Sequence, residues 1–253
     1  MAILSSFYPV ASAVLTYENE VDKCIENAAN THTIGFKGSM YRTESMPEHI
    51  RLRTNGSERV QIGEGSDGIY SGKVVTDFSE GELVETARPL DFAITGNAFF
   101  RLIGEDDKIK VTRAGNLHLD DEGYLVAPSG EKVMGADGAA ILLRTDQVVL
   151  GGDGALVDKD GQSLGKIGVW VVKDEKELER TDDNCFIAKT IELVELPSND
   201  AALRQCVLEE SNVDPVPNTL SIAKYSQGLG YYTNVGGMTK KMDERINEIV
   251  SQR

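Results

Sequence analysis

Apolar residues near the start of the chain recur every three or four positions. This unbroken heptad pattern predicts an amphipathic helix with a narrow apolar seam. Proline is tolerated in a first helical turn, so a firm helix is expected to begin near Pro9. Residues 30–37 are rich in cap and turn formers, and Gly35 is a candidate helix end. The seam positions are Phe7, Val10, Val14, Tyr17, Val21, Cys24 and Ala28.

A second pattern of the same kind lies near the end of the chain. Four glycines interrupt it, and each glycine costs about 1 kcal/mol in a helix interior. We therefore expect a weak helix that packing stabilises, with a kink or a close backbone contact at Gly228, Gly230, Gly236 and Gly237. A narrow seam resembles a coiled-coil face, so we expect the two ends to pair with each other and with neighbouring copies. The apolar positions are Val213, Val216, Leu220, Ala223, Tyr231, Val235, Met238, Met242, Ile246 and Ile249.

The middle of the chain has the pattern of short strands. Apolar runs alternate with turn-forming residues roughly every eight to twelve positions. Asn55-Gly56 between two such runs indicates a hairpin. The predicted fold class is α+β: N- and C-terminal helices paired as a coiled-coil-like module, with an all-β middle domain of short antiparallel strands. Further strand candidates are residues 90–94, 98–103, 109–112, 117–119, 124–126 and 169–172.

These patterns predict three parts. The terminal helical polymerisation module comprises residues 1–37 with 208–253, the all-β domain comprises 76–194, and 38–75 and 195–207 are linkers. The net charge of the chain is −15, and most of it falls between the two helical ends. An acidic middle argues against nucleic acid, which is bound through Lys and Arg at phosphates, and against an anionic membrane surface. We find neither a long apolar run for a membrane span nor the pattern of a cleavable signal peptide.

The sequence shows no motif for catalysis, for a cofactor or for a metal. The stretch from Gly68 to Lys73 has three residues between its glycines, and Val74 follows where a phosphate loop needs Ser or Thr. The acidic runs 120–122 and 182–183 do not alternate ligands as calcium loops do. We predict no catalytic residue, no metal and no cofactor. The three histidines, His32, His49 and His118, lack metal-ligand spacing.

The cysteines also lack a functional motif. Their number is odd and no CxxC occurs. We favour buried free thiols, since free cysteine usually behaves as a small core residue. A Cys185–Cys206 disulfide remains the alternative, and Cys24 would then be unpaired.

Several segments together resemble the flagellar rod and hook axial proteins. Residues 27–37, Asn-Ala-Ala-Asn-Thr-His-Thr-Ile-Gly-Phe-Lys, are similar to the family's N-terminal NLANxNTPGFK, with Ile34 where the family usually has proline. Residues 90–100 and 112–126 resemble its LDxAIxGxGFF and TRxGxFxxDxxGxLV segments. Residues 208–214 resemble its LExSNVD, whereas Tyr231 to Asn234 keep only part of the later Arg-x-Tyr-x-x-Asn element. The matches occur in the family's order.

The resemblance implies a structural subunit of the bacterial flagellar basal-body rod and no enzymatic activity. The length of the chain and its short stretch before Leu90 resemble a proximal rod member more than a distal one. It implies a subunit exported without signal cleavage that polymerises into a hollow, torque-transmitting helical tube in the periplasm. The implied partners are copies of itself, other rod proteins and the flagellar export apparatus. Besides the apolar positions of both seams, the candidate subunit-interface residues are Asn30, Gly35, Phe36, Asn212 and Asn234.

Two alternatives stay open at this point. A distal rod member of the same family would have the same motifs. A β-rich module that binds or hydrolyses peptidoglycan could also have helical ends, because paired catalytic carboxylates can come from distant residues. Binding and digestion of peptidoglycan would separate this second class from a rod subunit.

Overall fold

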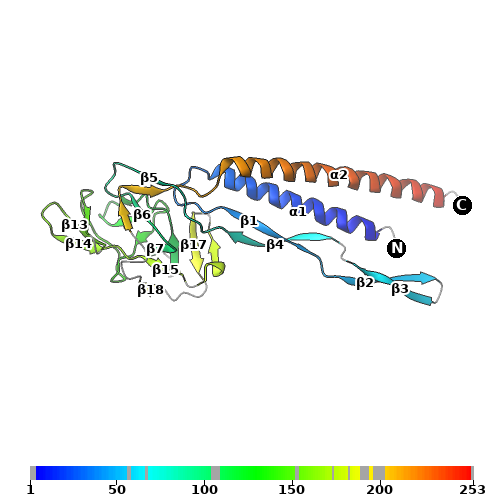
Figure 1. The fold of residues 1–253 in the computed structure, drawn as a ribbon, viewed down its shortest axis with the longest axis horizontal. Coiled ribbons are helices and arrows are strands. Elements are labelled where there is room, and N and C mark those ends of the chain that lie inside the picture. Colours follow the sequence, from blue (N-terminus) through cyan, green and yellow to red (C-terminus); the bar gives the residue numbers. More distant parts are fainter. Residues whose placement is uncertain are drawn as a thin grey trace. The chain divides into compact units, whose positions relative to one another are not determined.

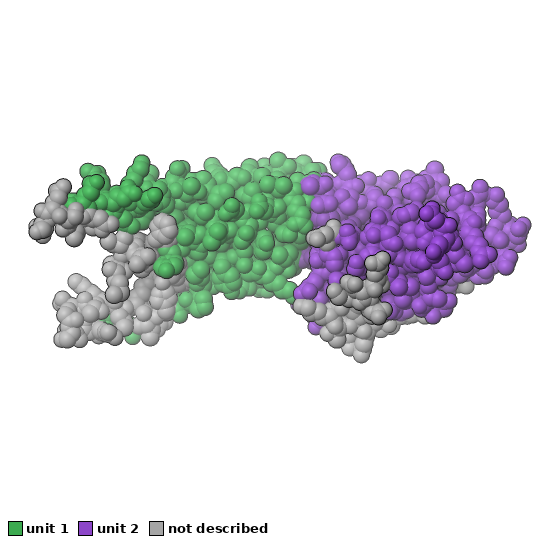
Figure 2. Space-filling model, turned by 180° about the vertical axis from the view of Figure 1, so that it is seen from behind, with its two compact units in different colours: residues 1–28, 39–75, 214–253 green, residues 29–38, 76–213 purple. Residues whose placement is uncertain are grey.

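A computed structural model of the chain describes residues 4–55, 58–65, 68–103, 109–151, 154–172, 174–181, 183–188, 194–195 and 203–251. The chain divides into two compact units (Figure 2). Unit 1 contains residues 1–28, 39–75 and 214–253, and unit 2 contains residues 29–38 and 76–213. The α+β fold class is confirmed, because a helix stands at each end of a β-rich middle.

The described residues of unit 1 form two helices and two β-ribbons (Figure 1). Helix α1 spans Leu4–Ala29 and helix α2 spans Pro215–Ser251. Residues 38–75, which the sequence suggested as a linker, instead contain four strands, because their polar and β-branched residues alternate. Strand β1 (Ser39–Ser45) pairs with β4 (Ile69–Thr76), and β2 (His49–Asn55) pairs antiparallel with β3 (Glu58–Gly65), which confirms the predicted hairpin.

Helix α1 lies beside the β1–β4 ribbon (Figure 1). Polar side chains join the two. Thr43 Oγ1 donates to Glu20 Oε1 at 2.8 Å, so the buried Glu20 carboxylate has a partner. Asn27 bonds both backbone groups of Ser39: its Nδ2 donates to the carbonyl at 2.8 Å, and its Oδ1 accepts from the N–H at 3.1 Å. Pro9 lies inside α1 rather than at its start, and α1 ends at Ala29, before Gly35.

Helix α2 contacts α1 through tyrosine rings and a hydrogen bond. The Tyr17 ring stacks on Tyr232, with centroids 5.5 Å apart, and meets Tyr225 at 6.1 Å. Asn218 Nδ2 donates to the Cys24 carbonyl at 2.9 Å. Residue numbers fall along α1 as they rise along α2, so the two helices are antiparallel. No kink is needed at the glycines, because the helical assignment of α2 continues through all four.

One glycine of α2 makes the close contact that the sequence suggested. A Cβ on Gly228 would lie 2.5 Å from Cε1 of Tyr17, whereas a Cβ on Gly230 meets nothing within 4 Å. Alanine favours a helix over glycine by about 1 kcal/mol at either site. The Tyr17 ring is held between two other tyrosines, so it cannot move away freely.

Gly230→Ala is therefore expected to stabilise the chain by about 0.5–1 kcal/mol, and Gly228→Ala to destabilise it by about 1 kcal/mol, since overpacking costs about 1–3 kcal/mol. Thermal unfolding followed by far-ultraviolet circular dichroism measures both. Equal stabilisation by the two substitutions would show that Tyr17 does not pack on Gly228.

The largest sheet of unit 2 is antiparallel in all its described pairings. Its path runs β16 (Leu178–Arg180), β17 (Cys185–Ala188), β8 (Ile109–Thr112), β7 (Ala98–Ile103), β11 (Lys132–Val133), β10 (Leu125–Val126) and β9 (His118–Leu119), and β15 (Trp170–Val171) pairs with β7 and with β18 (Val194–Glu195). A three-stranded sheet contains β12 (Val149–Leu150), β13 (Ala155–Val157) and β14 (Ser163–Lys166), and a short 3-10 helix spans Glu175–Glu177.

The C-terminal strands of unit 2 pair with strands from the N-terminal part of the same unit. Strand β19 (Leu203–Gln205) pairs with β6 (Phe92–Ile94), and β20 (Val207–Glu209) pairs with β5 (Leu83–Glu85). The sequence placed residues 195–207 in a linker, but these ladders give the chain's late residues a fixed place in unit 2. Strands β6 and β7 flank a predicted turn, yet β6 pairs with β19 and β7 with β8.

Strand β7 separates two hydrophobic cores of unit 2. Successive side chains of a strand point to opposite faces. Phe100 and Leu102 therefore join the larger core, while Phe99 joins a smaller one with Phe78 and Phe186. Both cores are closed by buried aromatic and aliphatic residues, so unit 2 has the interior of a stable domain.

Candidate assembly surface

Helix α2 carries exposed apolar side chains along one side, with the polar residues Lys224, Gln227, Asn234 and Arg245 between them. At about 100° per residue, these apolar side chains fall within an arc of about 80° around the helix. They lie on a different side from Tyr225, Gly228 and Tyr232, which face α1. Each side chain is between 63% and 66% exposed: Val216, Leu220, Tyr231, Met238, Met242 and Ile249. We call these six residues the α2 stripe.

The predicted interface residues fall into different environments. Ala28, Val216, Leu220, Tyr231, Asn234, Met238 and Met242 are exposed; Val10, Val14, Tyr17, Val21, Asn30, Asn212, Val213 and Val235 are half-buried; Cys24, Gly35 and Phe36 are buried. The side chains of Phe7 and Ile246 lie outside the described residues. The exposed members belong mainly to α2, and the N-terminal seam lies partly covered within unit 1.

The motif residues Gly35 and Phe36 lie inside unit 2. Gly35 has φ +66°, and its N–H donates to the Glu209 carbonyl at 2.7 Å. The Arg180 guanidinium lies over the Phe36 ring, 4.2 Å from its centroid. Asn212 accepts from the Gly38 N–H at 2.7 Å and donates to the Asp77 carbonyl at 2.8 Å. The N-terminal and C-terminal motifs therefore meet within the fold of unit 2.

Three buried charges lie at this meeting point. Lys37 Nζ is 2.6 Å from Glu209 Oε1, and Arg113 Nη1 is 3.5 Å from Glu209 Oε2. The Lys37 and Arg113 side chains are fully buried, and Glu209 is 1% exposed. Burial lowers the pKa of Lys37 and also that of Arg113, and the nearby Glu209 carboxylate opposes both shifts. The arrangement holds the fold together, and substrate could not reach it.

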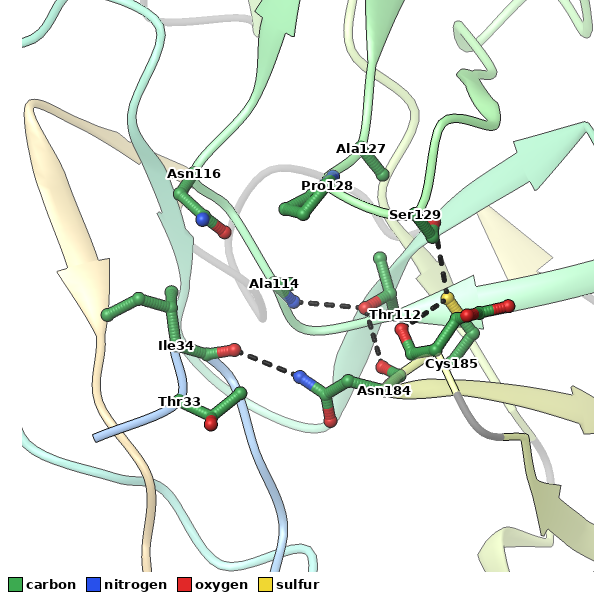
Figure 3. A pocket seen from close by; sticks show the side chains of 11 residues that line it. Thr33, Ile34, Thr112, Ala114, Asn116, Ala127, Pro128, Ser129, Asn184 and Cys185 are labelled. Atoms are coloured by element: carbon green, nitrogen blue, oxygen red, sulfur yellow. Dashed lines mark hydrogen bonds between the residues drawn. The ribbon is translucent and has the colours of Figure 1, made fainter. Parts of the chain in front are cut away.

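A cavity of about 90 Å³ lies beside the motif loop in unit 2 (Figure 3). Its groups mostly bond one another: Asn184 Nδ2 donates to the Ile34 carbonyl at 3.0 Å, and Thr112 Oγ1 donates to the Asn184 carbonyl at 3.0 Å (Figure 3). The amide oxygens of Asn116 and Asn184 have no partner in the described structure, but both are sealed from solvent. Burial raises the pKa of the Cys185 thiol, which makes it a poor nucleophile. The cavity therefore has no evident chemistry.

The remaining candidate residues have structural roles. Asp120 Oδ1 accepts from the N–H groups of Glu122 and Tyr124, at 3.0 and 2.7 Å, so it shapes a turn. Among the described residues, no group of His, Cys, Asp or Glu could hold a metal ion. Cys24, Cys185 and Cys206 are all free thiols. No described helix is both long and apolar enough to cross a membrane.

Comparison with known proteins identifies the family. Residues 93–178 match the family described as flagellar hook protein FlgE/F/G D1 domain. The chain is 31% identical over 214 residues to the flagellar basal-body rod protein FlgF of Mesorhizobium japonicum, covering 83% of each chain. The chain belongs to the flagellar basal-body rod proteins. It is also 32% identical to the rod protein FlgG of Bacillus subtilis (84% of this chain, 86% of that one) and 26% identical to the FlgF of Caulobacter vibrioides (97% and 99%).

Membership of the basal-body rod proteins confirms the resemblance seen in the motifs, including its FlgF-like character. It also confirms the expectation of a structural protein without enzymatic activity, because these relatives are structural rod proteins. The matched D1 region, residues 93–178, lies entirely within unit 2. It contains none of the candidate interface residues.

Sequence reasoning missed several residues that position the rod protein's elements. Tyr225 and Tyr232 face α1 although no apolar pattern included them. Lys37, Arg113 and Glu209 stand in the recognised motifs, but nothing in their spacing showed that they meet. Each of the three motifs is rich in polar residues, so no feature of the sequence marked these three charges as buried.

Proposed function

We propose that this chain is a structural subunit of the flagellar basal-body rod that polymerises through its terminal helices into a hollow helical tube. The observation that carries the proposal is the exposed α2 stripe. Six exposed apolar side chains share one side of a single helix, although polar residues lie between them. Exposed apolar surface gathered in this way favours an interaction site. A neighbouring rod subunit is the occupant that family membership favours.

The terminal helices provide a suitable polymerisation module. Residues 1–37 with 208–253 pair as a coiled-coil-like module, and the antiparallel contacts of Tyr17 and Cys24 with α2 support this pairing. Val14 and Val21 lie on the same seam of α1 and remain half-exposed. A contact between unlike surfaces of two copies propagates into an open helix, as a tube requires.

The proposed partners are copies of the chain, other rod proteins and the flagellar export apparatus. The rod lies in the periplasm, transmits motor torque and carries export through its centre, and its subunits are exported without signal cleavage. We assign the chain to the proximal, FlgF-type rod because of the short stretch before Leu90. A distal, FlgG-type position is the alternative, since relatives of both names match at similar identity.

Deletion of the gene tests the proposal directly. Cells without it are expected to be non-motile, and electron microscopy of their purified basal bodies is expected to show incomplete rods. Expression of the intact chain from a plasmid is the control and should restore both the rod and motility. Complete rods in the deletion strain would contradict the proposed function.

A further inference from the structure

Two positive charges are sealed inside unit 2. The side chains of Lys37 and Arg113 have no exposed surface, although they come from segments far apart in the sequence. Lys37 Nζ donates to the Ser79 carbonyl at 2.6 Å, and Arg113 Nη1 donates to the Ile94 carbonyl at 3.0 Å. These carbonyl oxygens accept from the two cations, whereas the buried Arg113 Nε has no partner in the described structure. The carbonyls carry no net charge to balance the two cations.

The balancing charge in direct contact comes from Glu209. In the described structure, the ion pairs of both cations run to this carboxylate, at 2.6 and 3.5 Å. Glu209 Oε1 also accepts from the Gly81 N–H at 3.0 Å, which fixes its position. Asp77 and Glu80 interact with the cations from exposed positions, and Glu175 interacts with Arg113 from a half-buried position. A buried charge that loses its partner is strongly destabilising, so Lys37 and Arg113 depend on Glu209.

Glu209 belongs to a segment that joins unit 2 from its C-terminal end. We define residues 203–213 as the closing segment. It contributes β19 to β6 and β20 to β5, and the Glu209 carbonyl accepts from the Gly35 N–H. Without this segment, the early strands β5 and β6 lose their ladder partners and the two cations lose their carboxylate.

We propose that Glu209 is a charge latch: unit 2 can bury Lys37 and Arg113 only when the closing segment has docked. Chains are made from the N-terminus, so residue 209 is among the last parts of unit 2 to become available. Unit 2 then remains open until nearly the whole chain exists. In a subunit that is exported unfolded, late closure keeps the chain export-competent; this consequence rests on the proposed function, whereas the latch itself does not.

The latch is tested in the purified full-length chain by urea unfolding followed through Trp170, the single tryptophan, which lies in unit 2. Glu209→Gln keeps the shape of the side chain and removes its charge. It is expected to raise the unfolded-to-folded ratio by about 100-fold or more, as for a broken buried ion pair. The matched control is Glu210→Gln, at the neighbouring half-buried carboxylate, which is expected to change the ratio less than about threefold.

A second variant separates lost charge balance from lost strand pairing. Lys37→Met together with Glu209→Gln removes one of the two stranded cations, so the ratio is expected to recover by about tenfold or more relative to Glu209→Gln alone. Replacing all three residues by methionine is expected to restore folding if Glu209→Gln does not fold at all. The latch is overturned if Glu209→Gln behaves like Glu210→Gln, or if removing the cations gives no recovery.

Discussion

Replacing Gly35 with alanine is expected to destabilise unit 2 by about 3–5 kcal/mol, a large effect for one methyl group. Gly35 has φ +66°, which costs a residue with a Cβ about 1–2 kcal/mol. The new Cβ would also lie 2.4 Å from the Arg113 carbonyl carbon and 2.5 Å from the Ala114 nitrogen. These are backbone atoms, so they cannot rotate away as a flexible side chain would.

Gly138→Ala provides the control for the backbone conformation alone. Gly138 also has a positive φ, +81°, and lies in unit 2, but its Cβ would meet nothing within 4 Å. We expect this variant to lose only about 1–2 kcal/mol. Urea unfolding followed by Trp170 fluorescence measures both variants. If Gly35→Ala and Gly138→Ala lose the same stability, Gly35 does not lie close to residues 113 and 114.

The sequence predicted the two terminal helices but not which face of each would be buried. The apolar pattern of α2 left open whether Leu220, Tyr231 and Met238 would face α1 or a neighbouring copy. In the structure these residues are exposed, and Tyr225 and Tyr232 face α1 instead. A monomer would normally bury its most apolar face, so the exposed stripe is expected only if another molecule covers it. Apolar spacing alone cannot distinguish an intramolecular seam from an intermolecular one.

Strand positions were more predictable than strand partners. The Asn55-Gly56 turn predicted the pairing of β2 with β3, because a two-residue turn fixes its neighbours locally. The pairings β19–β6 and β20–β5 join segments more than one hundred residues apart. No local turn chemistry specifies these pairings. For that reason the sequence predicted a linker at 195–207 instead of paired strands.

The motif residues show the same difference between local and distant information. The positive φ of Gly35 could be expected, since glycine readily adopts this conformation. Its role also depends on Arg113 and Glu209, which lie far from it in the sequence and contact it in the folded unit. The motifs thus identified the family from the sequence. The contact between their charged residues could be seen only in the folded structure.

Placing a charge on the α2 stripe is expected to abolish rod assembly without unfolding the chain. Leu220 and Met238 are each 66% exposed, so aspartate at either position should change the chain's stability by less than about 0.5 kcal/mol. If a neighbouring subunit covers the stripe, each aspartate becomes an unpaired charge in an apolar interface, which costs about 3 kcal/mol or more. That cost corresponds to an affinity loss of at least about 100-fold.

The measurement combines swimming in soft agar with the amount of the chain recovered in purified basal bodies. Leu220→Asp and Met238→Asp are expected to abolish swimming and leave basal bodies without the subunit, while Trp170 fluorescence shows unit 2 folded. Ser226→Asp is the matched control, because Ser226 is exposed on α2 but lies about 120° around the helix from Leu220. Its swimming should remain normal. Normal swimming of both stripe variants would exclude the α2 stripe as an assembly surface, whereas failure of all three would show that any charge on α2 prevents assembly.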